Sequence, residues 1–351
     1  MSVIPPASDG HPEVSLVIVT WNGRQHLEAC LDAVAAQDGP VHETVLVDNA
    51  SIDGTEAFVR ERYPWVRIVR LPTNAGFAGG SNAGARAARG RYLVFLNNDT
   101  VVQGGWLRAL REGLDEAKGV AMATSLVVYM DAPAVIDSAG DGMTRAGGAF
   151  KRLHGRRAEL AARSEEVFGA CGAAFIVPTA LFLVMGGFDE DFFASHEDVD
   201  FSYRAQLRGW RCRYVAEAVV HHKGSATLGR IKSGQVFLAQ RNSEWLYWKN
   251  TPGPLLVRSG LDHVVYNLAA AVHFARLGLL GTFLRAKWAA LAGLGPLLRK
   301  RAEVQRARTV SSGEIWRKLE PRWLRLKLSE EKFEIAIARR SAEASAPRQE
   351  S

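Results

Sequence analysis

Short apolar runs alternate with stretches of helical periodicity along the first two thirds of the chain. An apolar strand is predicted at residues 14–19, and Leu27, Leu31 and Val34 share one face of the helix expected after it. The alternation continues, with strands expected at 44–47, 66–71, 92–96, 173–177 and 212–220 and helices at 57–62, near Trp106, at 181–185 and at 198–207. Strands joined by right-handed helical crossovers build an α/β fold with a mostly parallel sheet.

Two segments break this alternation. Residues 74–82 read NAGFAGGSN, a glycine-rich loop that leads into a helix ending near Gly90. Residues 131–166 are polar, rich in glycine and arginine, and weakly periodic, so we expect them to form a loop or flap over the functional site.

Acidic residues stand where apolar strands end. The triplet Asn97-Asn98-Asp99 follows the strand at 92–96, and Asp48 follows the strand at 44–47. A third acidic position is the pair Glu197-Asp198, which opens a predicted helix. Because the carboxyl ends of parallel strands share one edge of a sheet, we expect a site at that edge. Hard oxygen ligands suit Mg²⁺ or Mn²⁺, so Asp99 is a candidate for holding a cation against a diphosphate.

The composition is that of a globular chain, with 47% hydrophobic and 23% charged residues among 351. One large domain with an appendage is expected at this length. The three cysteines, Cys30, Cys171 and Cys212, form no CxxC pair, and the N-terminus lacks the basic-then-apolar pattern of a signal peptide. A reducing cytosol is therefore the expected location.

The net charge of +7 is concentrated near the C-terminus, where twelve Arg or Lys and three Glu lie between Arg285 and Lys327. Residues 261–298 are rich in Leu, Ala and Val, but His, Arg and Lys interrupt them, so the pattern predicts a segment that lies on anionic lipid rather than crossing it. A helical cap packed on the α/β domain, or a dimer interface, is the alternative. Nucleic-acid binding is disfavoured because no recognition fold accompanies the basic residues.

These observations divide the chain into four parts. We expect a flexible N-terminus at 1–13, an α/β domain at 14–230, a helical, basic, membrane-associating region at 231–340 and a disordered tail at 341–351.

Six segments occur in an order that resembles a known family. They read VSLVIVTWNG, VLVDNASIDGT, NAGFAGGSNAG, YLVFLNNDT, GGFDEDFFASHEDVDFSYRAQLRGW and VVHHKGS. In this order they resemble the family 2 inverting glycosyltransferases of the GT-A fold, especially the bacterial rhamnosyltransferase-like branch. The resemblance implies a Rossmann-like, mostly parallel sheet flanked by helices, here with a helical C-terminal extension.

For the donor site, the resemblance implies that Asp48 accepts a hydrogen bond from the pyrimidine ring of the nucleotide, although an Asp here could instead cap the next helix. Thr20 and Asn22 match the loop that lines the base and ribose, and Trp21 between them either contacts the ligand or only packs. A final group is assigned to the loop that closes on the nucleotide and to the strand end beside it: Asn74, Gly76, Asn82 and Asn98.

For the metal site, Asp99 matches the last acid of the family's DxD motif, whose first carboxylate is replaced here by Asn97. The resemblance implies that Asp99 holds Mg²⁺ or Mn²⁺ together with diphosphate oxygens and water. The family's further ligand matches His221, or His222 if the register slips by one.

Sugar transfer with inversion needs a base on the acceptor side, and Asp198 is the candidate. Glu197 could orient the acceptor, and the two adjacent carboxylates could raise each other's pKa. The same acids, with Asp200, would also suit a helix N-terminus, and both interpretations can hold at once. Arg204 and Arg208 could add positive charge to the site or form salt bridges.

The resemblance thus implies a metal-dependent inverting glycosyltransferase at the inner, cytoplasmic face of a bacterial cell membrane. The expected donor is dTDP-rhamnose, with UDP-sugars next, and the expected acceptor is a hydroxyl of a glycan or polyprenyl-linked glycan in cell-surface polysaccharide synthesis. A non-catalytic nucleotide- or glycan-binding module that recruits partners to a membrane is the alternative. An NAD-dependent enzyme is disfavoured because the GxGxxG fingerprint is missing.

Overall fold

One ten-stranded sheet organises the part of the chain that the computed structural model describes, residues 12–224 and 233–326. Its main path runs β10-β12-β6-β11-β4-β1-β2-β3, with β5 beside β12 and β7 beside β6. The strands of this sheet are β1 (Val14–Thr20), β2 (His42–Asp48), β3 (Arg67–Arg70), β4 (Tyr92–Asn97), β5 (Thr100–Val102), β6 (Val120–Tyr129), β7 (Ala132–Ser138), β10 (Glu165–Val167), β11 (Ala174–Pro178) and β12 (Arg211–His222). A separate two-stranded sheet pairs β8 (Asp141–Met143) with β9 (Ala149–Lys151).

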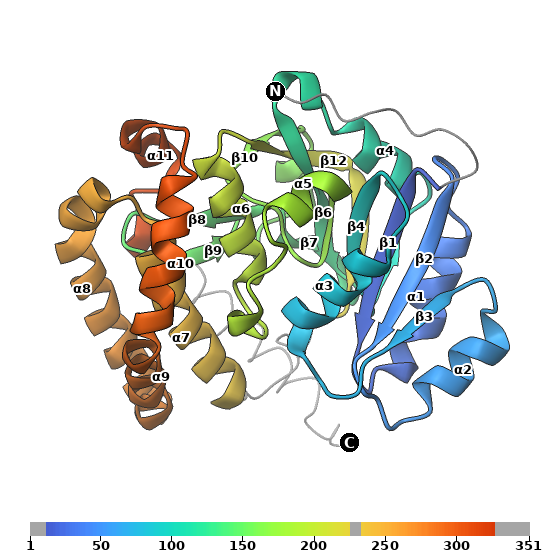
Figure 1. The fold of residues 1–351 in the computed structure, drawn as a ribbon, viewed down its shortest axis with the longest axis horizontal. Helices are drawn as coiled ribbons and strands as arrows, with labels where there is room; N and C mark the ends of the chain where they lie inside the picture. The colour runs from blue at the N-terminus through green and yellow to red at the C-terminus, as the bar shows by residue number, and fades with distance from the viewer. Residues whose placement is uncertain (1–11, 225–232, 327–351) are drawn as a thin grey trace, which may run out of the picture.

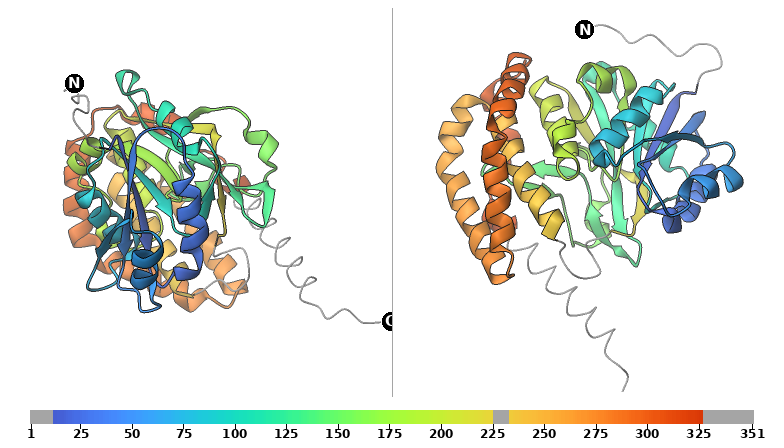
Figure 2. Two further views of the ribbon diagram at one scale, coloured as in Figure 1. Left: turned by 90° about the vertical axis from the view of Figure 1, so that its right-hand side faces the viewer. Right: turned by 60° about the horizontal axis from the view of Figure 1, so that its bottom comes forward.

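Helices cover both faces of the sheet and form a layer at one end. Those near the sheet are α1 (Arg24–Ala35), α2 (Thr55–Arg62), α3 (Gly76–Ala87), α4 (Trp106–Glu112), α5 (Thr179–Val184) and α6 (Glu197–Leu207), with short 3₁₀ turns η1 (Glu116–Lys118), η2 (Ala158–Ala161) and η3 (Glu190–Phe192). The layer contains α7 (Ser233–Asn250), α8 (Gly253–Arg276), α9 (Leu280–Ala292), α10 (Leu294–Arg306) and α11 (Ser312–Lys318). It lies beyond α6, at the end of the molecule opposite β1–β3 (Figures 1 and 2).

The strands β4, β1, β2 and β3 are parallel neighbours, and β6 and β12 form a second parallel pair. Only β11, which pairs with β4 and β6, runs antiparallel between these two groups. The predicted α/β fold with a mostly parallel sheet and C-terminal helices is therefore confirmed. Parallel alignment brings the ends of β1, β2 and β4 to one edge, where Thr20 stands opposite Asp48 and Val19 opposite Asn97.

Alternation along the strands builds a core on each face of the sheet. Val14, Leu16 and Ile18 of β1 point into the cluster that packs on α1 and α4, whereas Val17 joins the cluster under α3, α5 and α6. The second cluster is aromatic, with Phe95 4.9 Å from Phe182 between ring centroids. Burial on both faces explains why these strands read as continuous apolar runs.

The prediction of a loop or flap at residues 131–166 is wrong for most of that segment. It contains β7 to β9, η2 and the start of β10, and residues 136–144 are all buried. The buried positions include small and polar residues such as Asp137, Ser138 and Asp141, whose polar groups are paired inside the protein. A hydrophobic pattern cannot reveal burial of this kind.

The helical layer packs on the sheet domain through α6. Tyr203 and Leu207 of α6 share a buried cluster with Leu246 of α7, Leu255 of α8 and Ile315 of α11. Within the described ranges, no helix combines the length and the apolar character needed to cross a membrane. The flexible N-terminus and disordered tail predicted for 1–13 and 341–351 fall outside the described residues, except for positions 12 and 13.

Candidate active site

The loops after β1 and β2 and the loop before α6 all contain residues in the left-handed backbone region. Asn22 has φ 51° and Ala50 has φ 64°, and three of the four residues before α6, Phe193, Ser195 and His196, have φ values of 62°, 75° and 71°. Positive φ is unfavourable for side-chain-bearing residues and gathers at functional sites. Predicted site residues that stand in or beside these loops include Asn22, Asp48 and Asp198.

Asp48 is fully buried at the end of β2. Its Oδ1 accepts a hydrogen bond of 2.8 Å from the Ser51 backbone N–H, and its Oδ2 pairs with the guanidinium of Arg70. Asp48 does not cap α2, because its oxygens bond to Ser51 and Arg70 and the N-cap of that helix is Gly54. Arg70, at the end of β3, was not predicted as a site residue.

An open hollow of about 520 Å³ lies beside this pair. It is lined by residues of the loop after β2, by the first turns of α2 and by Arg70. Asn22 reaches the same loop, since its backbone N–H donates to Ser51 Oγ at 2.9 Å and its side chain accepts from the Ile52 backbone N–H at 2.8 Å. Trp21 is 58% exposed here, so it does not serve as core packing.

Asn49 ties the glycine-rich loop to the sheet edge. Its side-chain amide donates to Asn74 Oδ1 and to the Gly76 carbonyl, both at 2.9 Å. Gly76 has φ 71°, and a Cβ there would lie 2.2 Å from the carbonyl oxygen of Phe193. Only glycine therefore lets this loop approach the strained loop before α6.

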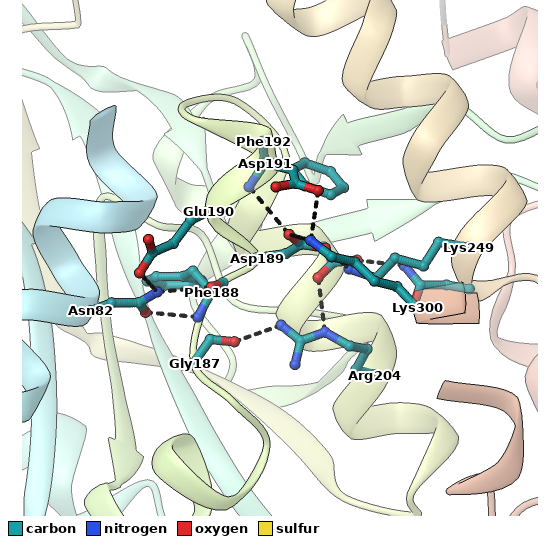
Figure 3. A network of polar contacts seen from close by, with 12 residues as sticks. Asn82, Gly187, Phe188, Asp189, Glu190, Asp191, Phe192, Arg204, Lys249 and Lys300 are labelled. Atoms are coloured by element: carbon teal, nitrogen blue, oxygen red, sulfur yellow. Dashed lines mark hydrogen bonds and ion pairs between the residues drawn. The ribbon is translucent and has the colours of Figure 1, made fainter. Parts of the chain in front are cut away.

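Asn82 lies on the inner face of α3 and bonds to the loop before α6 rather than to the sheet edge. Its amide nitrogen donates to the Phe188 carbonyl and to Glu190, and its oxygen accepts from the Phe188 backbone N–H, each at 2.9 Å. These contacts occupy the amide within the protein, as Figure 3 shows.

Asp99 and His222 face each other at the end of β4 and the end of β12. His222 Nε2 lies 3.2 Å from Asp99 Oδ1, and its Nδ1 lies 2.8 Å from Asp137 Oδ2. Asp137 is buried and also pairs with Lys151 Nζ at 2.6 Å. Next to Asp99, the Asn98 amide donates to Thr20 Oγ1 at 2.9 Å.

Strand alternation separates the two histidines. Successive side chains point to opposite faces, so His221 Nε2 contacts Gln103 at 2.9 Å while His222 faces Asp99. Of the two candidate ligands, the structure brings His222 to the acid.

This arrangement fits a divalent cation. A carboxylate oxygen and an imidazole nitrogen converge, and a second carboxylate, Asp137, fixes the ring from behind, as is usual around metal-bound histidines. No group of three or more His, Cys, Asp and Glu side chains in the described ranges could hold a metal ion by itself, so oxygens of a diphosphate and water would have to complete the shell.

Burial opposes a charge on His222, but hydrogen bonds to Asp137 and Asp99 raise its pKa to about 9. Burial likewise opposes a charge on Asp99, yet His222 keeps the pKa of that carboxyl below its usual range. Without a cation, the imidazolium bridges two carboxylates at neutral pH. Binding of a cation would release this proton.

Asp198 is in the first turn of α6 and is held by the backbone. The Gly172 N–H donates to Asp198 Oδ2 at 2.7 Å, and the Val199 N–H donates to Oδ1 at 2.8 Å. Gly172 stands at the same sheet edge as Asp99, because the Asn97 N–H bonds to the carbonyl of Ala173 at 2.9 Å.

Two further carboxyl groups lie near Asp198. Glu197 is buried, and its Oε2 has no hydrogen-bond partner within the described ranges. Burial raises the pKa of Glu197 well above its usual range, and the nearby charge of Asp198 adds to the shift. The same two causes raise the pKa of Asp141, which was not predicted as a site residue.

Buried ion pairs hold α6 from the other side (Figure 3). Lys249 of α7 lies 2.6 Å from Asp189 and 2.8 Å from Asp200, and all three side chains are almost fully buried. Lys300 of α10 joins Asp189 as well. Arg204 is structural, since it donates to Asp200 and to the carbonyls of residues 185 and 187.

Sequence comparison identifies the family. The sequence model described as "Glycosyl transferase family 2" matches residues 15–176. The chain is 30% identical over 284 residues to the N-acetylglucosaminyl-diphospho-decaprenol L-rhamnosyltransferase of Mycobacterium tuberculosis, covering 70% of this chain and 91% of that protein. It is 38% identical over 129 residues to the succinoglycan biosynthesis protein ExoO of Rhizobium meliloti, covering 36% of this chain and 37% of ExoO.

Structure comparison agrees on the fold. A mannosyltransferase from Pyrobaculum calidifontis, solved with GDP-Man and Mn²⁺, superposes with a TM-score of 0.52 at 18% identity, covering 96% of this chain and 89% of that one. The fold and the family match define a GT-A glycosyltransferase. The chain belongs to glycosyltransferase family 2.

Proposed function

We propose that the chain transfers a sugar, with inversion, from a nucleotide-diphospho-sugar to a hydroxyl of a glycan or lipid-linked glycan. The observation that carries this proposal is the carboxylate of Asp198, which is held by the Gly172 N–H at the sheet edge where β4 delivers Asp99. Inversion requires a base on one side of the sugar and a stabilised leaving group on the other.

In this reaction Asp198 accepts the proton of the acceptor hydroxyl as its oxygen forms a bond to the anomeric carbon. The bond from that carbon to the diphosphate oxygen breaks on the opposite face, and its electron pair leaves with the diphosphate. Asp99 and His222 would hold Mg²⁺ or Mn²⁺, which when bound neutralises negative charge on the diphosphate. Glu197 is assigned to orient the acceptor.

The nucleotide is assigned to the loops after β1 and β2. Asp48 would accept a hydrogen bond from the base, and the hollow beside Ser51 and Arg70 supports this assignment. Residues proposed to line the remainder of the donor site are Thr20, Asn22, Asn74, Gly76 and Asn98. Asn82 would act indirectly, by holding the loop before α6 against α3.

Rhamnose from dTDP-rhamnose is the first candidate donor, and UDP-sugars come next. The support is the mycobacterial relative, an N-acetylglucosaminyl-diphospho-decaprenol L-rhamnosyltransferase. By the same comparison we infer a polyprenyl-linked acceptor, a role in bacterial cell-surface polysaccharide synthesis, and a place of action at the inner face of the cell membrane.

The central test compares wild type with Asp198→Asn in a sugar-transfer assay containing Mg²⁺ or Mn²⁺. Removing the base should lower kcat roughly 10²- to 10⁴-fold with unchanged donor binding. Asp131→Asn, at an exposed turn, is the matched control and should keep the wild-type rate. A wild-type rate in the Asp198 variant would remove Asp198 as the base.

The donor can be identified by thermal unfolding against a panel of nucleotide-sugars with and without divalent cations. A ligand that binds only the folded state raises Tm, and the stabilisation grows with its affinity. dTDP-rhamnose should give the largest shift, and the shift should need the cation. A larger shift with another nucleotide-sugar would replace rhamnose in the proposal.

A further inference from the structure

Helix α8 has a stripe of large apolar side chains that face away from the protein. Six of them recur at helical spacing and are between 45% and 87% exposed: Val257, Leu261, Val264, Val265, Leu268 and Val272. The opposite face is packed, with Leu255, Ser259, His263 and Tyr266 buried. A surface helix of a globular protein normally exposes polar residues on its outer face. This helix therefore has an apolar face left over after its core contacts are made.

Helix α9 adds to the exposed apolar surface. Leu280, Leu284, Trp288 and Leu291 are between 38% and 73% exposed and are spaced as one helical stripe. The rings of Phe274 and Phe283 stack at 5.7 Å and join the two helices. Exposed apolar surface gathered over two neighbouring helices is typical of an interaction site.

The charges around this surface are almost all positive. Helices α8 to α10 contain eight Arg or Lys and two acids, Asp262 and Glu303, although Lys287 and Lys300 are paired with Glu244 and Asp189. Arg276, Arg285 and Arg299 are exposed next to Leu277, Leu284 and Leu298, and none of the three forms an ion pair with the described residues. Apolar residues bordered by arginine are the composition of helices that lie in the surface of an anionic bilayer.

The same charges argue against a second copy of the chain as the occupant. Two copies meeting through this surface would bring their arginines together, whereas acidic headgroups would attract them. We propose that the outward faces of α8 and α9 dock the protein on an anionic lipid bilayer. The apolar stripes enter the boundary between headgroups and acyl chains, and Arg276, Arg285 and Arg299 contact the headgroups.

Docking at this surface would hold the active site near the bilayer, because α7 packs between α9 and the helix that carries Asp198. The inference rests on the proposed function in one respect, since a lipid-linked acceptor gives the contact its purpose. Vesicle binding, however, requires no sugar transfer. Sugar transfer to a water-soluble acceptor requires no vesicle, so the two proposals can fail separately.

The test is co-sedimentation of the full chain with vesicles of phosphatidylcholine alone or mixed with phosphatidylglycerol. The wild type should bind the mixed vesicles at least tenfold more tightly, and high salt should reduce this preference. The double variant Leu261→Ser/Leu268→Ser should lose at least tenfold in binding. The matched control is Leu160→Ser/Val184→Ser, which changes one leucine and one valine exposed elsewhere on the protein, and it should bind as wild type.

Charge reversal tests the arginines separately. The triple variant Arg276→Glu/Arg285→Glu/Arg299→Glu should lose the preference for phosphatidylglycerol, while Arg163→Glu, an exposed residue near η2, should keep it. Failure of folded wild type to bind mixed vesicles would overturn the proposal, as would equal binding by the α8 variant. A dimer that the α8 variant disrupts, without any vesicle binding, would assign the surface to self-association and also overturn it.

Discussion

The sheet domain and the helical layer distribute polar and apolar residues differently. In the sheet, the strand interiors are apolar and buried, and the chemistry-bearing residues gather at one edge. In the helical layer, charged residues such as Lys249 are buried at the junction with α6, while valines and leucines of α8 face outward. Apolar residues of the strands are therefore buried, whereas those of the helical layer divide between the core shared with α6 and the outward face of α8.

The largest expected effect comes from the buried charge at the junction. Lys249→Met removes the cation shared by Asp189 and Asp200 and leaves both carboxylates without it in a buried site. We expect a loss of about 3–5 kcal/mol in the free energy of unfolding, measured by urea denaturation. Lys300→Met, whose side chain is 35% exposed, should cost about 1 kcal/mol or less. If both variants lost the same free energy of unfolding, the buried ion pairs of Lys249 would stabilise the protein no more than the partly exposed ones of Lys300.

A second prediction concerns the residue behind His222. Asp137→Asn should weaken Mn²⁺ binding about 10- to 100-fold, because the ring of His222 loses the carboxylate that orients it. Calorimetric titration of Mn²⁺ in the presence of a nucleoside diphosphate measures the change. Tm reports any loss of folding, since Asp137 also pairs with Lys151. Unaltered Mn²⁺ affinity in a folded variant would show that His222 needs no such support.

A third prediction separates ligand contact from structural support at the same loop. Asp48→Asn should weaken nucleoside diphosphate binding about tenfold, because a charged acceptor buried at the sheet edge is lost. Asp53→Ala should leave that affinity unchanged and cost about 1 kcal/mol in the free energy of unfolding, because the Asp53 side chain accepts hydrogen bonds from the backbone N–H groups of Arg24 and Thr55. Calorimetry and urea denaturation of both variants give the answer. If instead the Asp53 variant lost affinity for the nucleotide and the Asp48 variant lost only stability, Asp53 would be the ligand contact and Asp48 the structural residue.

The smallest expected effect is a gain in stability. Burial and the nearby charge of Asp198 raise the pKa of Glu197, so its contribution to stability falls as pH rises from about 4.5 towards the folded-state pKa. Glu197→Gln should remove this pH dependence and stabilise the protein by about 0.5–1 kcal/mol above that range. The measurement is the Tm of Glu197→Gln and of wild type at pH 5 and at pH 8. If the difference in Tm between the two proteins is the same at both pH values, the pKa of Glu197 is not raised in the folded protein.

Local sequence patterns were enough to predict the sheet and where its strands end. Asp48 and Asp99 could be predicted because they stand one and three residues after an apolar run, and Asp198 because it lies in the first turn of a helix. Arg70, Asp137, Asp141 and Lys249 could not, because their roles depend on partners far away in the sequence: Asp137 meets a histidine 85 residues later. The same limit explains the wrong prediction for residues 131–166, where polar residues are buried by pairing.

Lys249 also bears on how modular this enzyme is. The family's sequence model ends at residue 176, whereas α6, which carries Asp198, comes after that point. The charge of Asp200 in α6 is in turn neutralised by Lys249 of α7. Consider a chimaera that joins this chain, up to the end of β12, to the C-terminal helices of a relative. It would contain Asp189 and Asp200 but would lose Lys249, which pairs with both. Crossover points for such recombination belong after α11, so that the two layers are inherited together.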